Sequence, residues 1–357
     1  MAHASIPINK GNYSLETRQR EEAFHRNLGA GWLGKYKLYR ENWQKYPQRQ
    51  FVSDYPLLVD LELSTVCNLS CPMCYTITDK FKRKSKVKFM DYGLFCRIID
   101  EISGKVPAIR LSLRGEPTLH PRFLDCIIYA KEKGIGEVSA LTNGSKLTKG
   151  FSKRIMRAGM DWLTISVDGL GKVYENIRKP LKFKDTLRKI KDFKVLKKKA
   201  KTNKPVIKIQ SVWPAIRHDP QEFYNTFFKY TDLIAFNPLI DYLGKDGDIL
   251  YDLNFICPQH YQRLVIGSDG KALICANDEY GANIIGDADK ESIYEIWHGK
   301  KLSKIRAIFK KNNGFMRFPI CKECYLPRLT DESERVKIKG REVIIKNYLG
   351  RKQRVGQ

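Results

Sequence analysis

Three cysteines stand close together in the stretch STVCNLSCPMCYTITDK, residues 64–80. Cys67, Cys71 and Cys74 have the spacing C-x3-C-x2-C. Three thiols cannot all pair with one another, and disulfides accept only a narrow range of Cα separations and directions. The spacing therefore indicates metal binding or redox chemistry.

A second set of cysteines lies toward the C-terminus. Cys257 is followed by Gly270-x4-Cys275, and the pair Cys321-x2-Cys324 comes later. Four thiolates complete the coordination of one zinc ion or of one iron–sulfur cluster. Spacing alone does not separate these two metals, so both remain open at this point.

The elements that must position these thiols alternate along residues 57–239. Cys96 and Cys126 fall inside two of the amphipathic helices and are predicted to be buried structural thiols. The alternation predicts an α/β fold with a parallel sheet and right-handed crossovers. In such sheets, sites gather at the C-terminal strand ends, and the three-cysteine loop follows the first strand. Strands are predicted over 57–64, 108–113, 137–143, 162–168, 206–213 and 233–239, with helices over 91–103, 121–134, 150–159, 171–200 and 220–230.

The composition narrows the cellular context and the partners. The chain has 65 Lys and Arg against 39 Asp and Glu, a formal net charge of +26 over 357 residues. This excess predicts an anionic partner: a small molecule, a nucleic acid or an acidic lipid surface. No apolar run is long enough for a membrane span, and the N-terminus lacks the apolar core of a signal peptide. The sequence therefore predicts a cytoplasmic protein with reduced or metal-bound cysteines.

Three further segments extend the pattern around the first cysteine set. LRGEPTLHP (113–121) ends the second predicted strand, and LTNGSKL (141–147) and ISVDG (165–169) end the next two. With C-x3-C-x2-C, these segments resemble the radical S-adenosylmethionine (SAM) superfamily over about residues 57–240. The resemblance implies an α/β fold whose core is a partial (β/α)6 TIM-like barrel.

That resemblance also implies a cofactor site. Cys67, Cys71 and Cys74 would hold a 4Fe-4S cluster whose open iron takes the amino and carboxylate groups of SAM. The reduced cluster would split SAM to a radical that abstracts a substrate hydrogen, and a one-electron reductant such as flavodoxin or ferredoxin would supply the electron. The family usually has an aromatic residue before the last cysteine, whereas this chain has Met73. The implied cofactor-binding residues are Met73, Gly115, Glu116, Pro117, Asn143, Ser166, Asp168 and Arg178.

The C-terminal cysteines resemble the SPASM extension of that superfamily in its shortened, twitch-like form. Cys257, Cys275, Cys321 and Cys324 would then hold a second 4Fe-4S cluster in a small α+β domain. The predicted organisation is an N-terminal helical extension (1–55), the barrel (56–245), the auxiliary cluster domain (246–330) and a basic tail (331–357). The tail is predicted to form a hairpin that turns at Lys339-Gly340.

Three functions remain open from the sequence. The first is oxidation of a sugar-like or other anionic small molecule, with the auxiliary cluster as electron acceptor. The second is modification of a peptide or protein, although relatives of that kind carry an acidic base where this chain has Ala276. The third is RNA binding or modification, which only the basic, aromatic-rich segments suggest. No deprotonating base stands out, and Asp241, Tyr242 and His260 are candidates by proximity alone.

Overall fold

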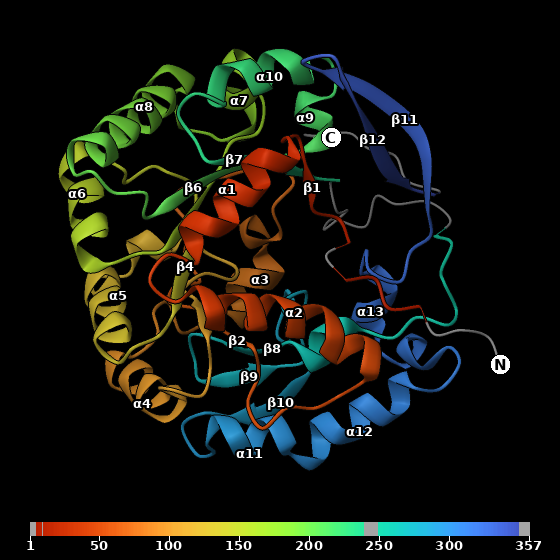
Figure 1. The fold of residues 1–357 in the computed structure, drawn as a ribbon. Helices are drawn as coiled ribbons and strands as arrows, with labels where there is room; N and C mark the ends of the chain where they lie inside the picture. The colour runs from red at the N-terminus through yellow and green to blue at the C-terminus, as the bar shows by residue number, and fades with distance from the viewer. Residues whose placement is uncertain (1–4, 9, 239–248, 350–357) are drawn as a thin grey trace.

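Six parallel strands form the centre of the molecule (Figure 1). The computed structural model describes residues 5–8, 10–238 and 249–349. The parallel strands are adjacent in the order in which the chain visits them, which confirms the predicted α/β class and barrel-like sheet. They are β2 (Leu58–Leu61), β3 (Ala108–Arg110), β4 (Glu137–Thr142), β5 (Trp162–Ser166), β6 (Val206–Val212) and β7 (Leu233–Asn237).

Helices form a ring outside these strands (Figure 1). The helical region predicted over 171–200 contains two helices, because Pro180 lies in the segment between them and proline disfavours a continuous helix. The helices of the ring are α4 (Tyr92–Ile102), α5 (Phe123–Glu132), α6 (Lys149–Ala158), α7 (Gly171–Ile177), α8 (Phe183–Lys199), α9 (Trp213–Ile216) and α10 (Pro220–Phe227).

Side chains alternate along each parallel strand between the helix ring and the barrel interior. The outward positions are apolar and belong to the main core; Val59, Ile109 and Ile207 are examples. The inward positions are apolar near the beginnings of the strands and include polar residues such as Asp60, Arg110 and Lys208 further along, and we call the space that they surround the lumen. Leu141 has the inward parity and is nevertheless 39% exposed, so the lumen around it is open to solvent.

Two N-terminal helices close one end of the barrel. α1 (Arg18–Leu28) and α2 (Leu33–Arg49) lie in front of the sheet in Figure 1. Their aromatic side chains, including Tyr39 and Trp43, pack against Leu58, Ala108 and Val206 at the beginnings of the strands. The N-terminal end of the barrel is therefore filled, and the opposite end carries the three-cysteine loop.

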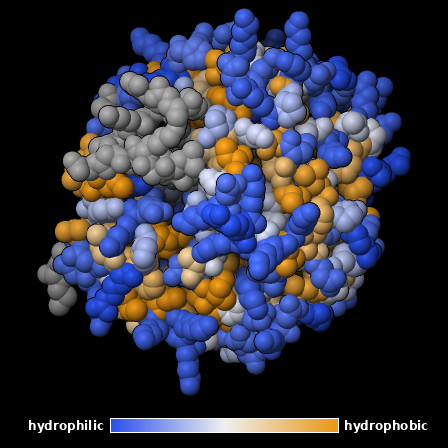
Figure 2. All heavy atoms as spheres, turned by 180° about the vertical axis from the view of Figure 1, so that it is seen from behind, coloured by the Kyte–Doolittle hydropathy of each residue, from blue (hydrophilic) through white to orange (hydrophobic). Residues whose placement is uncertain are grey.

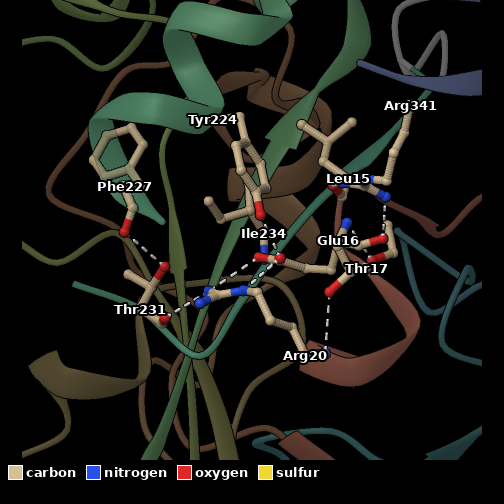
Figure 3. Close-up of polar contacts among 10 residues, drawn as sticks. Leu15, Glu16, Thr17, Arg20, Tyr224, Phe227, Thr231, Ile234 and Arg341 are labelled. Atoms are coloured by element: carbon tan, nitrogen blue, oxygen red, sulfur yellow. Dashed lines mark hydrogen bonds and ion pairs between the residues drawn. The ribbon is translucent and has the colours of Figure 1, made fainter. Parts of the chain in front are cut away.

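The N-terminal segment is tied to the edge of the sheet by a buried carboxylate. β1 (Tyr13–Ser14) pairs antiparallel with β7. Glu16 accepts hydrogen bonds from Tyr224 Oη at 2.8 Å and from the Ile234 amide at 3.0 Å, and it pairs with Arg20 (Figure 3). Arg341 donates to the Glu16 carbonyl at 2.8 Å. One side chain thus joins the start of the chain to β7 and α10, while its backbone binds the C-terminal hairpin.

The C-terminal region extends the same sheet from β2. Strand β8 (Arg263–Ile266) runs parallel to β2, and β9 (Lys271–Leu273) and β10 (Ile284–Asp287) follow antiparallel. Two helices follow them, α11 (Ile293–His298) and α12 (Lys300–Phe309), and Gly299 lies between the two. The predicted boundary at residue 245 lies outside the described residues.

The tail forms the predicted hairpin. β11 (Thr330–Ile338) and β12 (Arg341–Tyr348) pair antiparallel. Lys339 and Gly340 have φ values of 48° and 77°, the left-handed conformation that a two-residue hairpin turn requires. Among the described residues, no helix is both long and apolar enough to cross a membrane.

Candidate iron–sulfur and SAM site

The loop after β2 brings the first cysteine set together. Cys67, Cys71 and Cys74 are the barrel cysteines; Cys71 is buried and the Cys74 amide donates to the Cys71 carbonyl at 3.0 Å. Burial raises the pKa of Cys71 to about 11; Arg178 opposes this shift, and the neighbouring thiols Cys74 and Cys67 add to it. Three thiols and one guanidinium therefore share one neighbourhood at the C-terminal end of the barrel.

The GEP segment supports this loop from the next strand. The Gly115 amide donates to the Ser64 carbonyl at 3.2 Å, and the Glu116 amide donates to the Val66 carbonyl at 2.8 Å. A Cβ on Gly115 would lie only 2.5 Å from the Ser64 carbonyl oxygen. Because any larger side chain would meet backbone there, glycine is the residue that lets the two segments touch.

Glu116 is buried and fully engaged by the protein. Its Oε1 accepts from the Thr118 amide at 3.1 Å and from the Thr142 hydroxyl at 2.6 Å, and its Oε2 accepts from the Asn143 amide at 2.6 Å. The carboxylate thus joins the ends of β3 and β4. The resemblance implies that Gly115, Glu116 and Pro117 line the methionine amino group of SAM, and that contact stays a prediction for all three; the structure adds that Glu116 joins two strand ends.

Asn143 reaches from β4 to the cysteine loop. Its Nδ2 lies 3.7 Å from Cys67 Sγ and donates to Asn68 Oδ1 at 2.9 Å. Amide donors near a thiolate stabilise its negative charge. The predicted cofactor-binding residue is therefore in contact with a predicted metal ligand.

Asp168 and Arg178 form a buried ion pair at the end of β5. Arg178 Nε and Nη2 lie 2.7 and 2.6 Å from Asp168 Oδ2, and Asp168 Oδ1 accepts from the Val212 amide at 3.0 Å. This pair places the guanidinium near Cys71. Ser166 is buried at the same strand end, and Met73 is half-buried in the cysteine loop. The predicted site residues are thus brought to one end of the barrel.

The second cysteine set lines one cavity. Cys257 precedes the 3-10 turn Pro258–Tyr261, Cys275 follows β9, and Cys321 and Cys324 lie in and after α13 (Pro319–Glu323). We call these four residues the C-terminal cysteines. Burial raises the pKa of Cys257 to about 12, and the neighbouring Cys324 adds to the shift. The thiols converge, and all nine cysteines of the chain are free of disulfides.

One residue that the sequence did not single out contacts this second set. Asn277 Nδ2 donates to Cys324 Sγ at 3.1 Å. Asn277 and Cys324 also line a neighbouring pocket whose other walls include Lys80, Glu279 and Tyr280. Lys80 lies just beyond the barrel cysteines, and the Tyr75 and Tyr280 rings are 6.0 Å apart. The pocket therefore adjoins the C-terminal cysteines, and Tyr280 connects it to Tyr75, the residue after Cys74.

The remaining sequence candidates lie elsewhere. Cys126 is fully buried as predicted, whereas Cys96 is only partly buried. His260 is buried against Phe309 with ring centroids 4.7 Å apart, and burial lowers its pKa to about 3. The positions 241 and 242 lie outside the described residues.

The lumen carries charged residues that the sequence analysis missed. Asp60 pairs with Arg110 at 2.8 Å and with Arg263 at 3.2 Å, so one carboxylate serves two guanidinium groups. Lys208 lies on the lumen side of β6. The signal was present in the sequence: AIRLSL and VIKIQSV alternate apolar and charged or polar residues, which indicates that the charged positions face inward.

A six-stranded parallel barrel with two sets of neighbouring thiols at one end is an arrangement that suits a protein with metal clusters. The profile of the Radical SAM superfamily matches residues 61–215, and the profile of an iron–sulfur cluster-binding domain, SPASM, matches residues 257–325. The chain belongs to the radical SAM superfamily and carries a SPASM domain.

Known proteins are similar to parts of this chain. A tungsten-containing aldehyde ferredoxin oxidoreductase cofactor-modifying protein of Pyrococcus furiosus is 35% identical over 113 residues, which is 31% of this chain and 30% of the relative. An Fe-coproporphyrin III synthase of Methanosarcina barkeri is 25% identical over 142 residues, 39% of this chain and 35% of the relative. The matches thus span about a third of each relative's length.

Solved structures share the fold. SuiB of Streptococcus suis, bound to the precursor peptide SuiA, superimposes with a TM-score of 0.58 at 15% identity, covering 82% of this chain and 76% of SuiB. The protein anSMEcpe with bound AdoMet gives a TM-score of 0.56 at 16% identity, covering 71% and 83%. At these identities the likeness concerns the fold alone.

The donor sets fit the cofactors of these two domains. A radical SAM domain binds a 4Fe-4S cluster together with SAM, and a SPASM domain binds further iron–sulfur clusters. Three thiols leave one iron of a cluster open for SAM, whereas four thiols close a cluster. The SPASM match favours iron over zinc at the C-terminal cysteines.

Proposed function

We propose that the protein oxidises an anionic small molecule, sugar-like or otherwise, by radical SAM chemistry. Cys67, Cys71 and Cys74 would hold the cluster that, with SAM, supplies a hydrogen-abstracting radical, and the C-terminal cysteines would hold a second cluster able to accept one electron from the substrate. A one-electron reductant such as flavodoxin or ferredoxin would charge the barrel cluster, and we expect the enzyme to act in the cytoplasm.

The observation that carries this proposal is the pocket beside Cys324, one of whose lining residues, Tyr280, lies with its ring 6.0 Å from the ring of Tyr75, which directly follows Cys74. Cys324 and Asn277 form part of one wall, and Lys80 forms part of another. A substrate held there would lie beside the predicted second cluster and near the loop that carries the first, as oxidation with an internal electron acceptor requires. Residues of the chain itself position the site. Asp168 holds Arg178 beside the barrel cysteines, and Glu116 holds the ends of β3 and β4 together.

Charge favours an anionic substrate. On the lumen side, Arg110 and Arg263 share the carboxylate of Asp60, and among the described residues Lys208 has no carboxylate within ion-pair distance. Names of several relatives point the same way, because the GTP of a GTP 3',8-cyclase and the porphyrin of an Fe-coproporphyrin III synthase are anionic small molecules. These names describe the relatives, and for this chain they support a proposal.

The peptide-modifying alternative lacks its expected base. Ala276 occupies the position directly after the second SPASM cysteine, and the nearby Asp278 accepts from the amides of Ala282 and Asn283, both at 2.8 Å. That carboxylate caps a turn. The RNA alternative also loses support, because several basic residues are engaged internally; Lys131 and Lys204, for example, both pair with Asp161.

Deuterium transfer tests the proposal. The reconstituted enzyme would be incubated anaerobically with SAM, dithionite and deuterated anionic metabolites, and 5'-deoxyadenosine would be analysed by mass spectrometry. We expect deuterium in 5'-deoxyadenosine together with a product two hydrogens lighter than the substrate. Transfer only from a peptide, or no cleavage of SAM at all, would contradict the proposal.

A further inference from the structure

Lys208 is a buried cation on the inner wall of the barrel. It lies in β6, its side chain shares the lumen side with Gln210, and it is 6% exposed. Its partners in the sheet register are Thr164 on β5 and Leu233 on β7. The groups beside it on both neighbouring strands are therefore uncharged.

The ammonium group has an incomplete set of partners. Lys208 Nζ donates to Asn12 Oδ1 at 3.0 Å and lies 5.9 Å from the centre of the Trp162 ring. Among the described residues, no carboxylate lies within ion-pair distance of it. An ammonium group has three donors, and one neutral acceptor leaves most of its hydrogen-bonding capacity unused.

Another buried lysine, Lys197, and two partly buried ones, Lys131 and Lys204, have carboxylate partners. Lys197 pairs with Asp232 at 2.8 Å, and Lys131 and Lys204 each approach Asp161 to 2.7 Å. Each of these lysines has a carboxylate that offsets the cost of burial. Lys208 is the contrasting case, in which a charge is buried without its counter-charge.

The position of Lys208 makes it accessible to a ligand. Its partner Asn12 is exposed, and Leu141 on the lumen side of β4 is exposed as well. Across the lumen, Arg110 and Arg263 share Asp60 and leave a net positive charge there. The lumen therefore has an excess of positive charge and an opening to solvent.

We propose that Lys208 binds an anionic group of the substrate, a carboxylate or a phosphate, on the β6 wall of the lumen. This inference rests on the proposed function and identifies one residue that holds that substrate. An anion would occupy the unused donors of the ammonium group and supply the missing counter-charge. Burial alone lowers the pKa of Lys208 to about 7, so the group can take up a proton as the anion binds.

Anion binding can be measured without turnover. The reconstituted holoenzyme would be titrated with inorganic phosphate and with malonate at constant ionic strength, by calorimetry, at pH 6.5 and pH 8.5. We expect binding at pH 6.5 and affinity that falls about tenfold per pH unit above the lysine pKa, because only the ammonium form holds the anion. Binding of phosphate but not malonate would indicate a phosphorylated substrate, and the reverse a carboxylated one.

Two variants make the assignment specific. Lys208→Met has a similar shape without charge and should lose at least about tenfold in affinity at pH 6.5. Lys208→Arg should keep the affinity at both pH values, because arginine does not titrate in this range. If Lys208 had only a structural role, its replacement by arginine would not remove the dependence of anion affinity on pH. The matched control is Lys199→Met at the exposed end of α8, which should bind as the wild type does.

The outcomes separate this inference from the proposed function. If neither anion binds the wild type, or if Lys208→Met binds as tightly as the wild type, the assignment of Lys208 is wrong. The proposed function is tested independently by iron content and 5'-deoxyadenosine formation in the wild type. A wild type that cleaves SAM but binds anions without Lys208 would leave the proposed function standing and overturn the inference.

Discussion

At the scale of single residues, the clearest constraint is the contact between the GEP turn and the cysteine loop. A Cβ on Gly115 would lie 2.5 Å from the Ser64 carbonyl oxygen and 2.6 Å from the Val66 carbonyl oxygen. Gly115→Ala should therefore push the two segments apart at a cost of about 1–3 kcal/mol. We expect a lower thermal unfolding midpoint and incomplete iron loading, measured by calorimetry and iron analysis.

Gly150→Ala is the matched control for that substitution. Gly150 lies in α6 and has no atom within 4 Å of a built Cβ. Alanine is the better helix former by about 1 kcal/mol, so this variant should be unchanged or slightly stabilised. Equal unfolding midpoints and iron contents in the two variants would show that the close approach at Gly115 does not contribute to stability.

A second residue-scale prediction concerns pH. Burial raises the pKa of Glu137 to about 7, above its ordinary value of 4.5. The folded protein therefore holds this proton more tightly than the unfolded chain, and stability falls as the pH rises from 4.5 through 7. Glu137→Gln should be more stable than the wild type at pH 8 by at most about 3 kcal/mol, with little difference at pH 4.5. Thermal unfolding at both pH values checks this, and a variant that is less stable at pH 8 would contradict it.

Asn277 provides a third prediction at this scale. Its amide donates to Cys324 Sγ at 3.1 Å. A hydrogen-bond donor to cluster sulfur stabilises the reduced cluster, which carries the greater negative charge, and therefore raises the reduction potential. Asn277→Leu should therefore make the potential of the second cluster more negative, as measured by a redox titration followed by electron paramagnetic resonance. An unchanged potential would show that this contact has no influence on the cluster.

The sequence revealed ligands better than it revealed their supports. The cysteine spacing and the GEP segment could be recognised in the sequence, because each is a short motif of residues that are close together in the chain. Asn277 and the Asp60 pairs are contacts between distant segments, and single residues of those types carry no local signal. The engagement of Glu116 by Thr142 and Asn143 likewise depends on how two strand ends meet.

At the scale of elements, Glu16 joins three parts of the fold (Figure 3). Glu16→Ala would leave Tyr224 Oη and the Ile234 amide without this acceptor, which costs about 1–3 kcal/mol for each buried donor. We expect a lower unfolding midpoint and faster hydrogen exchange in β1 and at the start of α1. Glu22→Ala removes an exposed pair with Arg18 and should cost at most about 1 kcal/mol. A similar loss in both variants would contradict a special role for Glu16.

Periodicity was a good guide to the barrel and a poorer one elsewhere. The six predicted strands appear in place because each is a short segment that is either continuously apolar, as in LIAF (233–236), or alternates, as in VIKIQSV (206–212). The two-residue strand β1 was missed, since its pairing with β7 depends on the Glu16 contacts rather than on its own sequence. The breaks at Pro180 and Gly299 show residues that interrupt helices which periodicity alone would continue.

At the scale of the whole molecule, the C-terminal region is part of the barrel sheet rather than a separate appendage. β8 pairs with β2 in parallel register, and the main core includes Ile274 and Trp297 together with barrel residues. This continuity fixes the C-terminal cysteines relative to the barrel cysteines. It is the physical basis for expecting two clusters that act on one substrate. The face opposite to α1 and α2 is largely hydrophilic, with hydrophobic patches between (Figure 2).

The continuity of the sheet leads to a test of the second cluster. Reconstituted wild type should bind about eight irons per chain, and the double variant Cys321→Ala, Cys324→Ala about four. The variant should still cleave SAM, because the barrel cysteines are intact, although loss of a metal site also removes some folding energy. Formation of the oxidised product should stop, because the electron from the substrate would have no acceptor. The measurements are iron content, 5'-deoxyadenosine and product from the same reactions.

Cys96→Ala is the control for general effects of cysteine loss, since Cys96 lies in α4 and belongs to neither thiol set. It should retain the full iron content and both activities. A zinc site at the C-terminal cysteines would instead give zinc and about four irons in the wild type, and both steps would fail together in the double variant as the fold weakens. Intact substrate oxidation after loss of the second metal site would rule out the role of that cluster as electron acceptor, while leaving the radical SAM assignment of the barrel in place.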